Sequence, residues 1–237
     1  MSSYQTVLLA AGQGKRMQAG RNKQFLTIAG TPLLIHTLRV FEEDSFCQAV
    51  VLVANDKETE EIRALLQEWG LGKKTSIVSG GKERQDSVSC GLKALSENGA
   101  GGKETVLIHD AARPFVTKDK LQQLAEEAAA SGAAILAVRV KDTVKEVTGG
   151  TITKTVDRSS LWAAQTPQAF SFEVIASAHE KAEKNNYLGT DDASLVEYTG
   201  GPVTIVEGTY ENFKVTTPED MMFAEAVVRS RQEGNHK

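Results

Sequence analysis

The sequence has few cysteines, no metal-binding histidine spacing and no long apolar run. Cysteine occurs only at Cys47 and Cys90, without CxxC pairing, which argues against a disulfide framework or a cysteine-based zinc site. The four histidines show no HExxH spacing, so no built-in transition-metal site is expected. No apolar run reaches the roughly 18 residues that a membrane-spanning helix needs. With 41 % hydrophobic and 24 % charged residues, the chain still has the composition of an ordinary folded protein.

Acidic residues outnumber basic ones, with 31 Asp and Glu against 27 Lys and Arg. The net charge of −4 argues against a nucleic-acid partner, and the first residues lack the basic and long apolar segments of a secretory signal. We therefore expect a cytoplasmic protein that binds neither nucleic acid nor membrane. The 237 residues suffice for a sizeable core, so a single domain over 1–237 is predicted. Where cations do gather, at Lys15, Arg16, Arg21 and Lys23, they indicate a local anion site.

Short apolar runs rich in β-branched residues alternate with longer segments of helical period. Strands are expected at 6–11, 48–54, 75–79, 105–110 and 133–140, and helices at 32–43, 56–69, 86–97 and 118–131. This alternation is typical of βαβ units around a mostly parallel sheet. We predict an α/β fold, a Rossmann-like three-layer sandwich, in which the parallel strands end at one edge where ligands usually bind.

The alternation of apolar strand runs and helical segments ends after residue 140. The stretch "DTVKEVTGGTITKTV" consists of two polar, β-branched runs joined by Gly149 and Gly150, which is a hairpin pattern. It is too polar to be buried on both faces, so it is expected to project, either as a dimerisation arm or as a solvated hairpin. Beyond it we expect helices near 171–184 and after Thr190, a strand at 202–207, and a last helix whose N-cap is Thr217.

The stretch "LLAAGQGKRM", residues 8–17, is the first that carries chemistry. A strand ending in small residues lets backbone N–H groups approach an anion closely, which suits a phosphate. A dinucleotide fingerprint would need GxGxxG and an acid about 20 residues further on, but Ala19 and Gly20 stand out of register and no acid precedes Glu42. The Walker pattern fails as well, because an arginine follows the GK pair. A nicotinamide-dependent oxidoreductase is therefore disfavoured.

The stretch "HDAARPF" (109–115) lies at the end of an expected strand, at the same edge. Asp110 is well placed there to hold a divalent cation against a triphosphate, and Arg113 to bind an anionic acceptor with two hydrogen bonds. The alternative is that Asp110 caps the next helix and Arg113 pairs on the surface. In "GGKERQDSV" (80–88) the glycines let the backbone contact a base edge and Ser87 can add a hydrogen bond, although such glycine pairs are usually turns.

The stretch "AAGQGKRM", followed by Lys23, resembles the signature of sugar-nucleotide and alditol-phosphate nucleotidyltransferases. "NKQF", "GGKERQDSV", "HDAARPF", "TVDRSSLWAAQTPQAF", "TDDASLVE" and "VEGTYENFKVTTPED" follow in the order of the 2-C-methyl-D-erythritol 4-phosphate cytidylyltransferase family, which the chain resembles over nearly its whole length. The resemblance implies transfer of CMP from CTP to 2-C-methyl-D-erythritol 4-phosphate in the non-mevalonate route to isoprenoid precursors. It also implies Mg²⁺, or another divalent cation, and a homodimer.

The resemblance assigns roles to individual residues. Arg16, Lys23, Arg158 and Lys214 would be catalytic, the first two as transition-state stabilisers and the other two by positioning the acceptor. CTP would bind to Ala10, Ala11, Gly12, Gly14, Arg16, Lys23, Gly81, Ser87 and Ala111. The acceptor pocket would hold Asp110, Arg113, Thr143, Arg158, Thr166, Thr190 and Lys214, with Asp110 as a metal ligand. In this family the β-arm, here about 139–165, crosses to the partner, so Arg158 and Thr143 would act in trans.

Some positions depart from the family pattern, and alternatives stay open. Leu9 replaces a common proline and Glu211 a common aspartate, which puts a role of the Glu211 carboxylate in acceptor binding in doubt. Spacing also allows Lys214 to be a surface lysine. The acids Asp191 and Asp192 are expected to be structural, because the first turn of a helix favours negative charge.

Two other functions compete with cytidylyl transfer to methylerythritol phosphate. Ribitol-5-phosphate cytidylyltransferase resembles this chain in "KQF", "TPQ" and "NFKVTTP", but "AAGQG" and "DAARPF" favour the methylerythritol family. A catalytically silent nucleotide-binding regulator would need only the CTP half of the site. The presence of Arg158 and Lys214 beside the CTP-binding stretches therefore speaks against such a regulator.

Overall fold

Seven strands form the main sheet of the computed structural model, which describes residues 2–12 and 22–234. They are β1 (Tyr4–Leu9), β4 (Cys47–Ala54), β5 (Thr75–Ser79), β6 (Thr105–Asp110), β7 (Ala133–Arg139), β10 (Trp162–Ser171) and β11 (Thr204–Glu207). Their order across the sheet is β11-β7-β10-β6-β1-β4-β5. Every neighbouring pair is parallel except the two that β10 makes, with β6 and with β7. The predicted mostly parallel sheet is confirmed.

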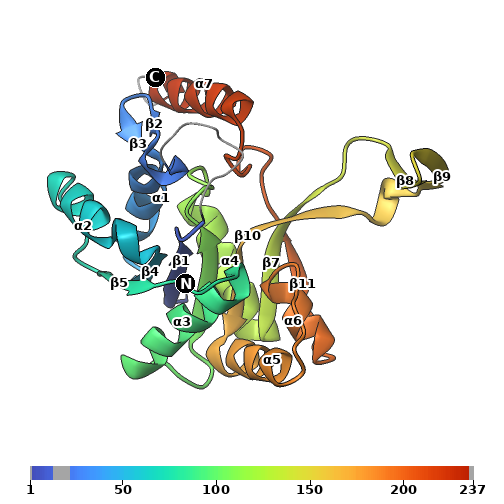
Figure 1. Ribbon diagram of the computed structural model, residues 1–237, viewed down its shortest axis with the longest axis horizontal. Coiled ribbons are helices and arrows are strands. Elements are labelled where there is room, and N and C mark those ends of the chain that lie inside the picture. The colour runs from blue at the N-terminus through green and yellow to red at the C-terminus, as the bar shows by residue number, and fades with distance from the viewer. Residues whose placement is uncertain (1, 13–21, 235–237) are drawn as a thin grey trace.

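Helices cover both faces of this sheet (Figure 1). One face packs against α1 (Leu33–Glu42), α2 (Thr59–Glu68) and α4 (Lys118–Ser131), and the other against α3 (Arg84–Glu97), α5 (Phe172–Lys184) and α6 (Asp192–Tyr198). Strand β6, covered on both sides, is buried at all six positions, as expected for a central strand of such a sheet. The predicted three-layer sandwich is confirmed. Within the described ranges, no helix combines the length and apolar character needed to cross a membrane.

The last helix, α7 (Pro218–Gly234), packs beside the short hairpin of β2 (Thr27–Ile28) and β3 (Thr31–Pro32), as Figure 1 shows. Its start agrees with the predicted N-cap. The Thr217 hydroxyl accepts the N–H of Asp220 at 3.3 Å, and the Asp220 carboxylate accepts the N–H of Thr217 at 2.9 Å. This reciprocal pair satisfies backbone donors that the helix leaves free, so the chain turns into α7 at a fixed point.

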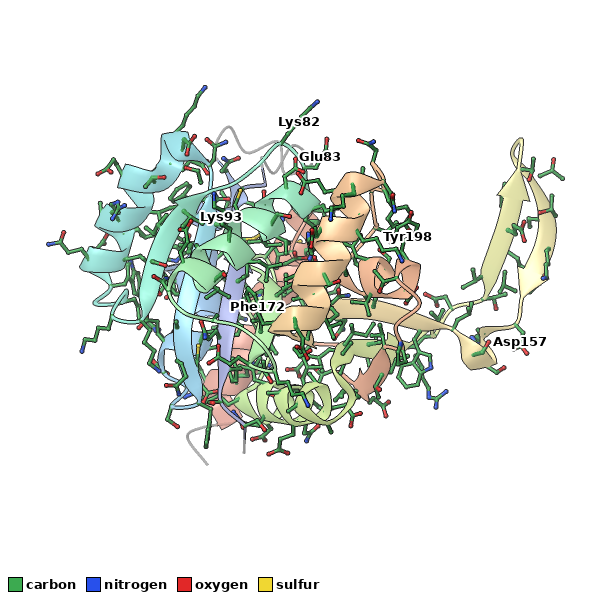
Figure 2. The ribbon with its side chains drawn as sticks, turned by 90° about the horizontal axis from the view of Figure 1, so that it is seen from below. Lys82, Glu83, Lys93, Asp157, Phe172 and Tyr198 are labelled. Atoms are coloured by element: carbon green, nitrogen blue, oxygen red, sulfur yellow. The ribbon has the colours of Figure 1, made fainter. Side chains whose placement is uncertain are left out.

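The hairpin of β8 (Val144–Thr148) and β9 (Thr151–Val156) projects from the body, and both figures show it as an arm, with Asp157 labelled on it in Figure 2. Its turn is Gly149-Gly150, with φ angles of 58° and 82°, which glycine adopts without strain. The arm continues β7 and β10, since Trp162 pairs with Arg139 in the main sheet. The segment that projects is therefore 140–161, and the ends of the predicted range 139–165 belong to sheet strands.

Strand β10 is the element that sequence periodicity does not predict, and it fixes the edge where the pocket lies. Thr166, on β10, accepts the backbone N–H of Asp110 at 3.0 Å through its hydroxyl oxygen, which lies 3.1 Å from Nδ1 of His109. Nε2 of His109 lies 3.0 Å from the carbonyl oxygen of Arg113. Because a carbonyl only accepts, Nε2 carries the proton and Nδ1 accepts from Thr166. Burial of this neutral ring lowers the pKa of His109 to about 4.

The buried ring of His109 predicts a pH dependence of stability. Its pKa is about 4 in the folded chain against 6.5 ordinarily, so the unfolded chain binds more protons in that window. The free energy of unfolding should therefore fall as pH is lowered from about 6.5 to about 4. An NMR titration of the His109 ring should show it neutral at pH 5, while the same ring in the urea-unfolded chain titrates near its ordinary value. A folded-state midpoint above pH 6 would contradict the assigned network.

Candidate active site

A pocket of about 680 Å³ opens where β1, β4, β5 and β6 end. Its walls include Leu9, Ala10, Ala11, Gly12, Lys23, Gln24, Leu33, Asn55, Asp56, Gly80, Gly81, Lys82, Glu83, Arg84, Ser87, Asp110, Ala111, Ala112 and Lys214. Figure 2 shows Lys82 and Glu83 at the start of α3, on the rim. This is the edge that parallel strands share, and the volume suits a ligand of nucleotide size.

Backbone from three loops forms one side of the pocket. Ala111 donates its N–H to the carbonyl of Leu9 at 3.0 Å, which ties the loop after β6 to the loop after β1. A Cβ on Gly80 would lie 2.7 Å from the Cβ of Ala11, so a larger residue there would separate the loops after β1 and β5. The residues predicted to bind CTP that the structure describes all line this pocket: Ala10, Ala11, Gly12, Lys23, Gly81, Ser87 and Ala111. Gly14 and Arg16 lie outside the described residues.

The Gly81 loop is held from inside by α3. Buried Ser87 accepts the N–H of Gly81 at 3.1 Å and donates its hydroxyl to the carbonyl of Glu83 at the same distance. A Cβ on Gly81 would lie 2.2 Å from that of Asp86, so only glycine fits without a shift of the helix. Ser87 thus shapes the loop, and its hydroxyl oxygen keeps a second lone pair for the predicted hydrogen bond to a ligand.

Three cations surround Asp110 on the opposite side of the pocket. Its Oδ2 lies 2.7 Å from Nζ of Lys214 and 3.9 Å from Nε of Arg113, and its Oδ1 lies 3.5 Å from Nε of Arg84. Burial alone would raise the pKa of Asp110, but the charges of Lys214, Arg84 and Arg113 outweigh it and hold the pKa below its usual range. The carboxylate therefore stays ionised, and the cluster has an excess of positive charge that suits a phosphate.

Arg84 is a member of this cluster that sequence reasoning missed. Its guanidinium also pairs with buried Asp192 at 2.7 Å, and Oδ1 of Asp192 lies 3.6 Å from Nε2 of His179. The helix was expected to begin at residue 86, but α3 begins at Arg84, which places the side chain at the pocket. With a helix start expected at residue 86, Arg84 would lie outside the first turn, so no local signal in the sequence marks it. Asp192 is structural, as expected, because it orients Arg84.

Lys214 reaches the pocket because the loop after β11 folds back over the sheet. Buried Asn212 donates from its side-chain amide to Oε1 of Gln165 at 3.1 Å and to the carbonyl of Thr166 at 2.9 Å. Val215 donates its N–H to the carbonyl of Ala112 at 2.8 Å. Lys214 lies between these anchors and pairs with Asp110, so the alternative of an isolated surface lysine is wrong.

The loop after β11 also accounts for Arg113 and Glu211. Arg113 is largely buried and donates to the carbonyl of Asn212 at 2.8 Å, so the alternative of a pairing on the surface is wrong, and binding of an acceptor by Arg113 stays a prediction. Glu211 points the other way and pairs with Arg231 of α7 at 2.9 Å, on the outside of the loop. The doubt that the sequence raised about Glu211 therefore agrees with its position.

Of the residues predicted for the acceptor, Asp110 and Lys214 line the pocket of this chain, whereas Arg113 and the remaining ones do not. Thr166 lies beneath Asp110, where its hydroxyl is occupied by the backbone and His109. Thr190 lines a separate cavity of about 90 Å³ beside Arg84. Thr143 and Arg158 are exposed on the arm, and Arg158 donates to the carbonyl of Lys141 there.

The pocket has few ligands for a metal ion. No group of three or more histidine, cysteine or acidic side chains in the described part of the chain could hold one. The carboxylates of the pocket wall are Asp56, Glu83 and Asp110, and Asp110 already faces three cations. One or two carboxylates together with substrate phosphates are the usual ligands of Mg²⁺. The donor set therefore fits an ion that arrives with a triphosphate, and it does not form a cage of its own.

Solved structures share this architecture. Over 96 % of both chains, the structure superposes with a TM-score of 0.83 on 4-diphosphocytidyl-2C-methyl-D-erythritol synthase from Anaerococcus prevotii, which is 29 % identical. With 2-C-methyl-D-erythritol 4-phosphate cytidylyltransferase from Francisella tularensis the TM-score is 0.80 at 30 % identity, over 94 % of this chain and 98 % of the other.

Sequence relatives match at higher identity and nearly full length. The 2-C-methyl-D-erythritol 4-phosphate cytidylyltransferase of Halalkalibacterium halodurans is 54 % identical over 97 % of this chain and 98 % of the relative. The protein of the same name from Bacillus licheniformis is 50 % identical over 99 % of both chains. The family model described as IspD, 2-C-methyl-D-erythritol 4-phosphate cytidylyltransferase, matches residues 4–230. This chain therefore belongs to the 2-C-methyl-D-erythritol 4-phosphate cytidylyltransferase family, as the motifs of its sequence predicted.

Proposed function

We propose that the pocket binds CTP and 2-C-methyl-D-erythritol 4-phosphate and joins them into 4-diphosphocytidyl-2-C-methyl-D-erythritol with release of pyrophosphate. The observation that carries this proposal is the meeting of two features at one sheet edge. Backbone loops with the glycines Gly12, Gly80 and Gly81 form one wall, and Asp110 forms the other with Arg84 and Lys214, two of the three cations around it. A reaction between two polyanions needs both a cradle for one phosphate chain and fixed positive charge for the other.

The chemistry needs positioning and electrostatic stabilisation, without a covalent nucleophile. An acceptor phosphate oxygen attacks the α-phosphorus of CTP in line. The bond from that phosphorus to the oxygen bridging the β-phosphate breaks, and pyrophosphate leaves with the electron pair. Negative charge grows on the non-bridging and leaving oxygens, so a cation fixed there lowers the barrier. Lys23, on the pocket wall, is assigned this task together with Arg16.

The cluster around Asp110 is assigned to the acceptor. Lys214 and Arg113 supply positive charge for the acceptor phosphate. The attraction of both side chains to the Asp110 carboxylate offsets the repulsion between them. Mg²⁺, or another divalent cation, would be held by triphosphate oxygens together with Asp110 and would neutralise phosphate charge. The preference for methylerythritol phosphate over ribitol 5-phosphate rests on the family match.

The dimer is the second part of the proposal. We assign residues 1–237 to a single cytidylyltransferase domain that pairs through its arm, so that Arg158 and Thr143 complete the partner's acceptor site. Support comes from the arm itself, where Val147 and Ile152 are 54 % and 60 % exposed although both are apolar. Arg158 lies on the same arm, outside the pocket of its own chain. A cytoplasmic location stays a prediction of the sequence.

Release of pyrophosphate tests the activity directly. The chain is mixed with CTP and Mg²⁺ and offered either methylerythritol 4-phosphate or ribitol 5-phosphate, and pyrophosphate is measured by a coupled assay. We expect turnover with the first acceptor and little with the second. Turnover with ribitol 5-phosphate alone would favour the related cytidylyltransferase, and CTP binding without any turnover would favour a silent regulator.

Replacement of Lys23 tests the mechanism. Lys23→Ala should lower kcat by roughly 10²–10³-fold, because it removes charge that acts in the transition state. The Kd for CTP, measured by calorimetry, should change much less. Lys93→Ala is the matched control, since Lys93 is an exposed lysine on α3 and lies away from the pocket wall. Weaker CTP binding with unchanged kcat would assign Lys23 to ground-state binding instead.

Mixing two inactive variants tests action in trans. In a heterodimer of Lys23→Ala and Arg158→Ala subunits, one site would combine an intact pocket with an intact arm. Random exchange of subunits should restore about a quarter of the wild-type rate, since half of the dimers are mixed and each regains one of two sites. Each variant mixed with itself is the control. If Arg158 acts within its own chain, mixing restores nothing.

A further inference from the structure

Lys23 begins a single turn of 3-10 helix, η2 (Lys23–Phe25), whose other side chains are turned into the protein. Phe25 is 5 % exposed and belongs to the hydrophobic core, and Gln24 is 3 % exposed. Phe25 donates its N–H to the carbonyl of Asn22, and Leu26 donates to that of Lys23. The Lys23 ammonium group donates to the carbonyl of Val215 at 3.4 Å, and because a lysine side chain is flexible, the backbone of this turn sets the region that this group can reach.

One carboxylate holds both neighbours of Lys23. The Glu58 side chain accepts a hydrogen bond at each oxygen: Oε1 from the side-chain amide of Asn22, and Oε2 from that of Gln24 at 2.5 Å. The two amide donors thus stand on either side of Lys23 in the chain, while Glu58 comes from a segment more than 30 residues further along. Hydrogen bonds to an ionised acceptor are the stronger kind, and two of them to one planar group fix orientation as well as distance.

The local role of Glu58 does not account for these bonds. Glu58 ends η3 (Asp56–Glu58) and precedes α2, but its side chain makes no capping bond to the helix backbone. Burial raises the pKa of its carboxyl, and the hydrogen bond from Gln24 lowers it. A carboxylate that is partly buried needs hydrogen-bond donors, and among the residues that the structure describes Glu58 accepts from Asn22 and Gln24.

We propose that Glu58 is a positioning residue for the transfer reaction, which fixes the backbone on both sides of Lys23 and so aims its ammonium group at the reacting phosphate. This inference rests on the function proposed above. Glu58 is not among the residues that line the pocket, so it acts through Lys23 and not by contact with substrate. A misplacement of about 1 Å in such a group costs as much as 10²-fold in rate.

A double-mutant cycle tests the proposal. Glu58→Ala should lower kcat about tenfold or more while the KM for CTP changes little, because only alignment is lost. In a Lys23→Ala background, Glu58→Ala should lower kcat no further, because Glu58 acts on the reaction only through Lys23. Glu58→Gln, which keeps one acceptor oxygen, should fall between. The control is Glu60→Ala, which removes a carboxylate two residues away whose side chain is 91 % exposed.

Hydrogen exchange gives a readout that needs no turnover. In Glu58→Ala, and to a lesser degree in Glu58→Gln, the amides of Phe25 and Leu26 should exchange faster, while Glu60→Ala leaves them unchanged. Equal losses of kcat from Glu58→Ala with and without Lys23 would overturn the proposal, as would an effect on melting temperature or KM alone. An inactive wild type would reject the proposed function. Unchanged amide exchange in Glu58→Ala would separately reject the proposal that Glu58 fixes the backbone around Lys23.

Discussion

The salt-bridge cluster around Asp110 is the interaction on which the rest of the site depends. The carboxylate sits at the end of β6 and pairs with Arg84 from the start of α3, with Arg113 from its own loop and with Lys214 from the loop after β11. Three cations so close together would repel one another strongly in a partly buried site. The charge of Asp110, together with that of Asp192 on Arg84, makes their gathering possible, and three cations against two carboxylates leave the excess of positive charge that phosphates need.

Buried polar side chains around this cluster serve to hold its backbone in place. Thr166 and His109 fix the end of β6, and Asn212 fastens the loop that carries Lys214. Each hydrogen bond of a buried polar group in this network restricts the arrangement of the backbone that carries it. The same logic applies on the far wall, where Ser87 serves the loop of Gly81. Side chains that look like ligand-binding groups in the sequence therefore also hold the backbone of the site in place.

Much of the fold could be predicted because it follows from apolar periodicity. Strands such as Thr75–Ser79 and Thr105–Asp110 were predicted with their observed bounds, since each is a short apolar run that ends at polar residues. Strand β10 escaped prediction because Gln165, Thr166 and Gln168 interrupt its apolar pattern. Their burial is possible only through partners distant in sequence, such as Thr209 and Asp191. The sequence around β10 does not indicate which distant residues these side chains will bond.

The candidate site, like the fold, contains residues that could be predicted from the sequence and residues that could not. The wall of small residues could be predicted, since Ala10, Ala11 and Gly12 at a strand end indicate an anion site in the sequence itself, whereas their assignment to CTP came from the family resemblance. Arg84 could not, because its role depends on α3 starting two residues earlier than its apolar pattern suggests and on two acids from other segments. The roles of Thr143 and Arg158 came from the family resemblance alone, and no contact within one chain reveals them.

The continuity of the arm with β7 and β10 limits where this chain can tolerate insertions. Residues added at Gly149-Gly150 lengthen a solvated tip and leave every paired strand in register. One residue added between Trp162 and Gln165 would exchange the two faces of the strand beyond it, because strand side chains alternate. The hydroxyl of Thr166 would then leave Asp110. Variation in length among related chains should therefore gather at the tip of the arm and stop at its base.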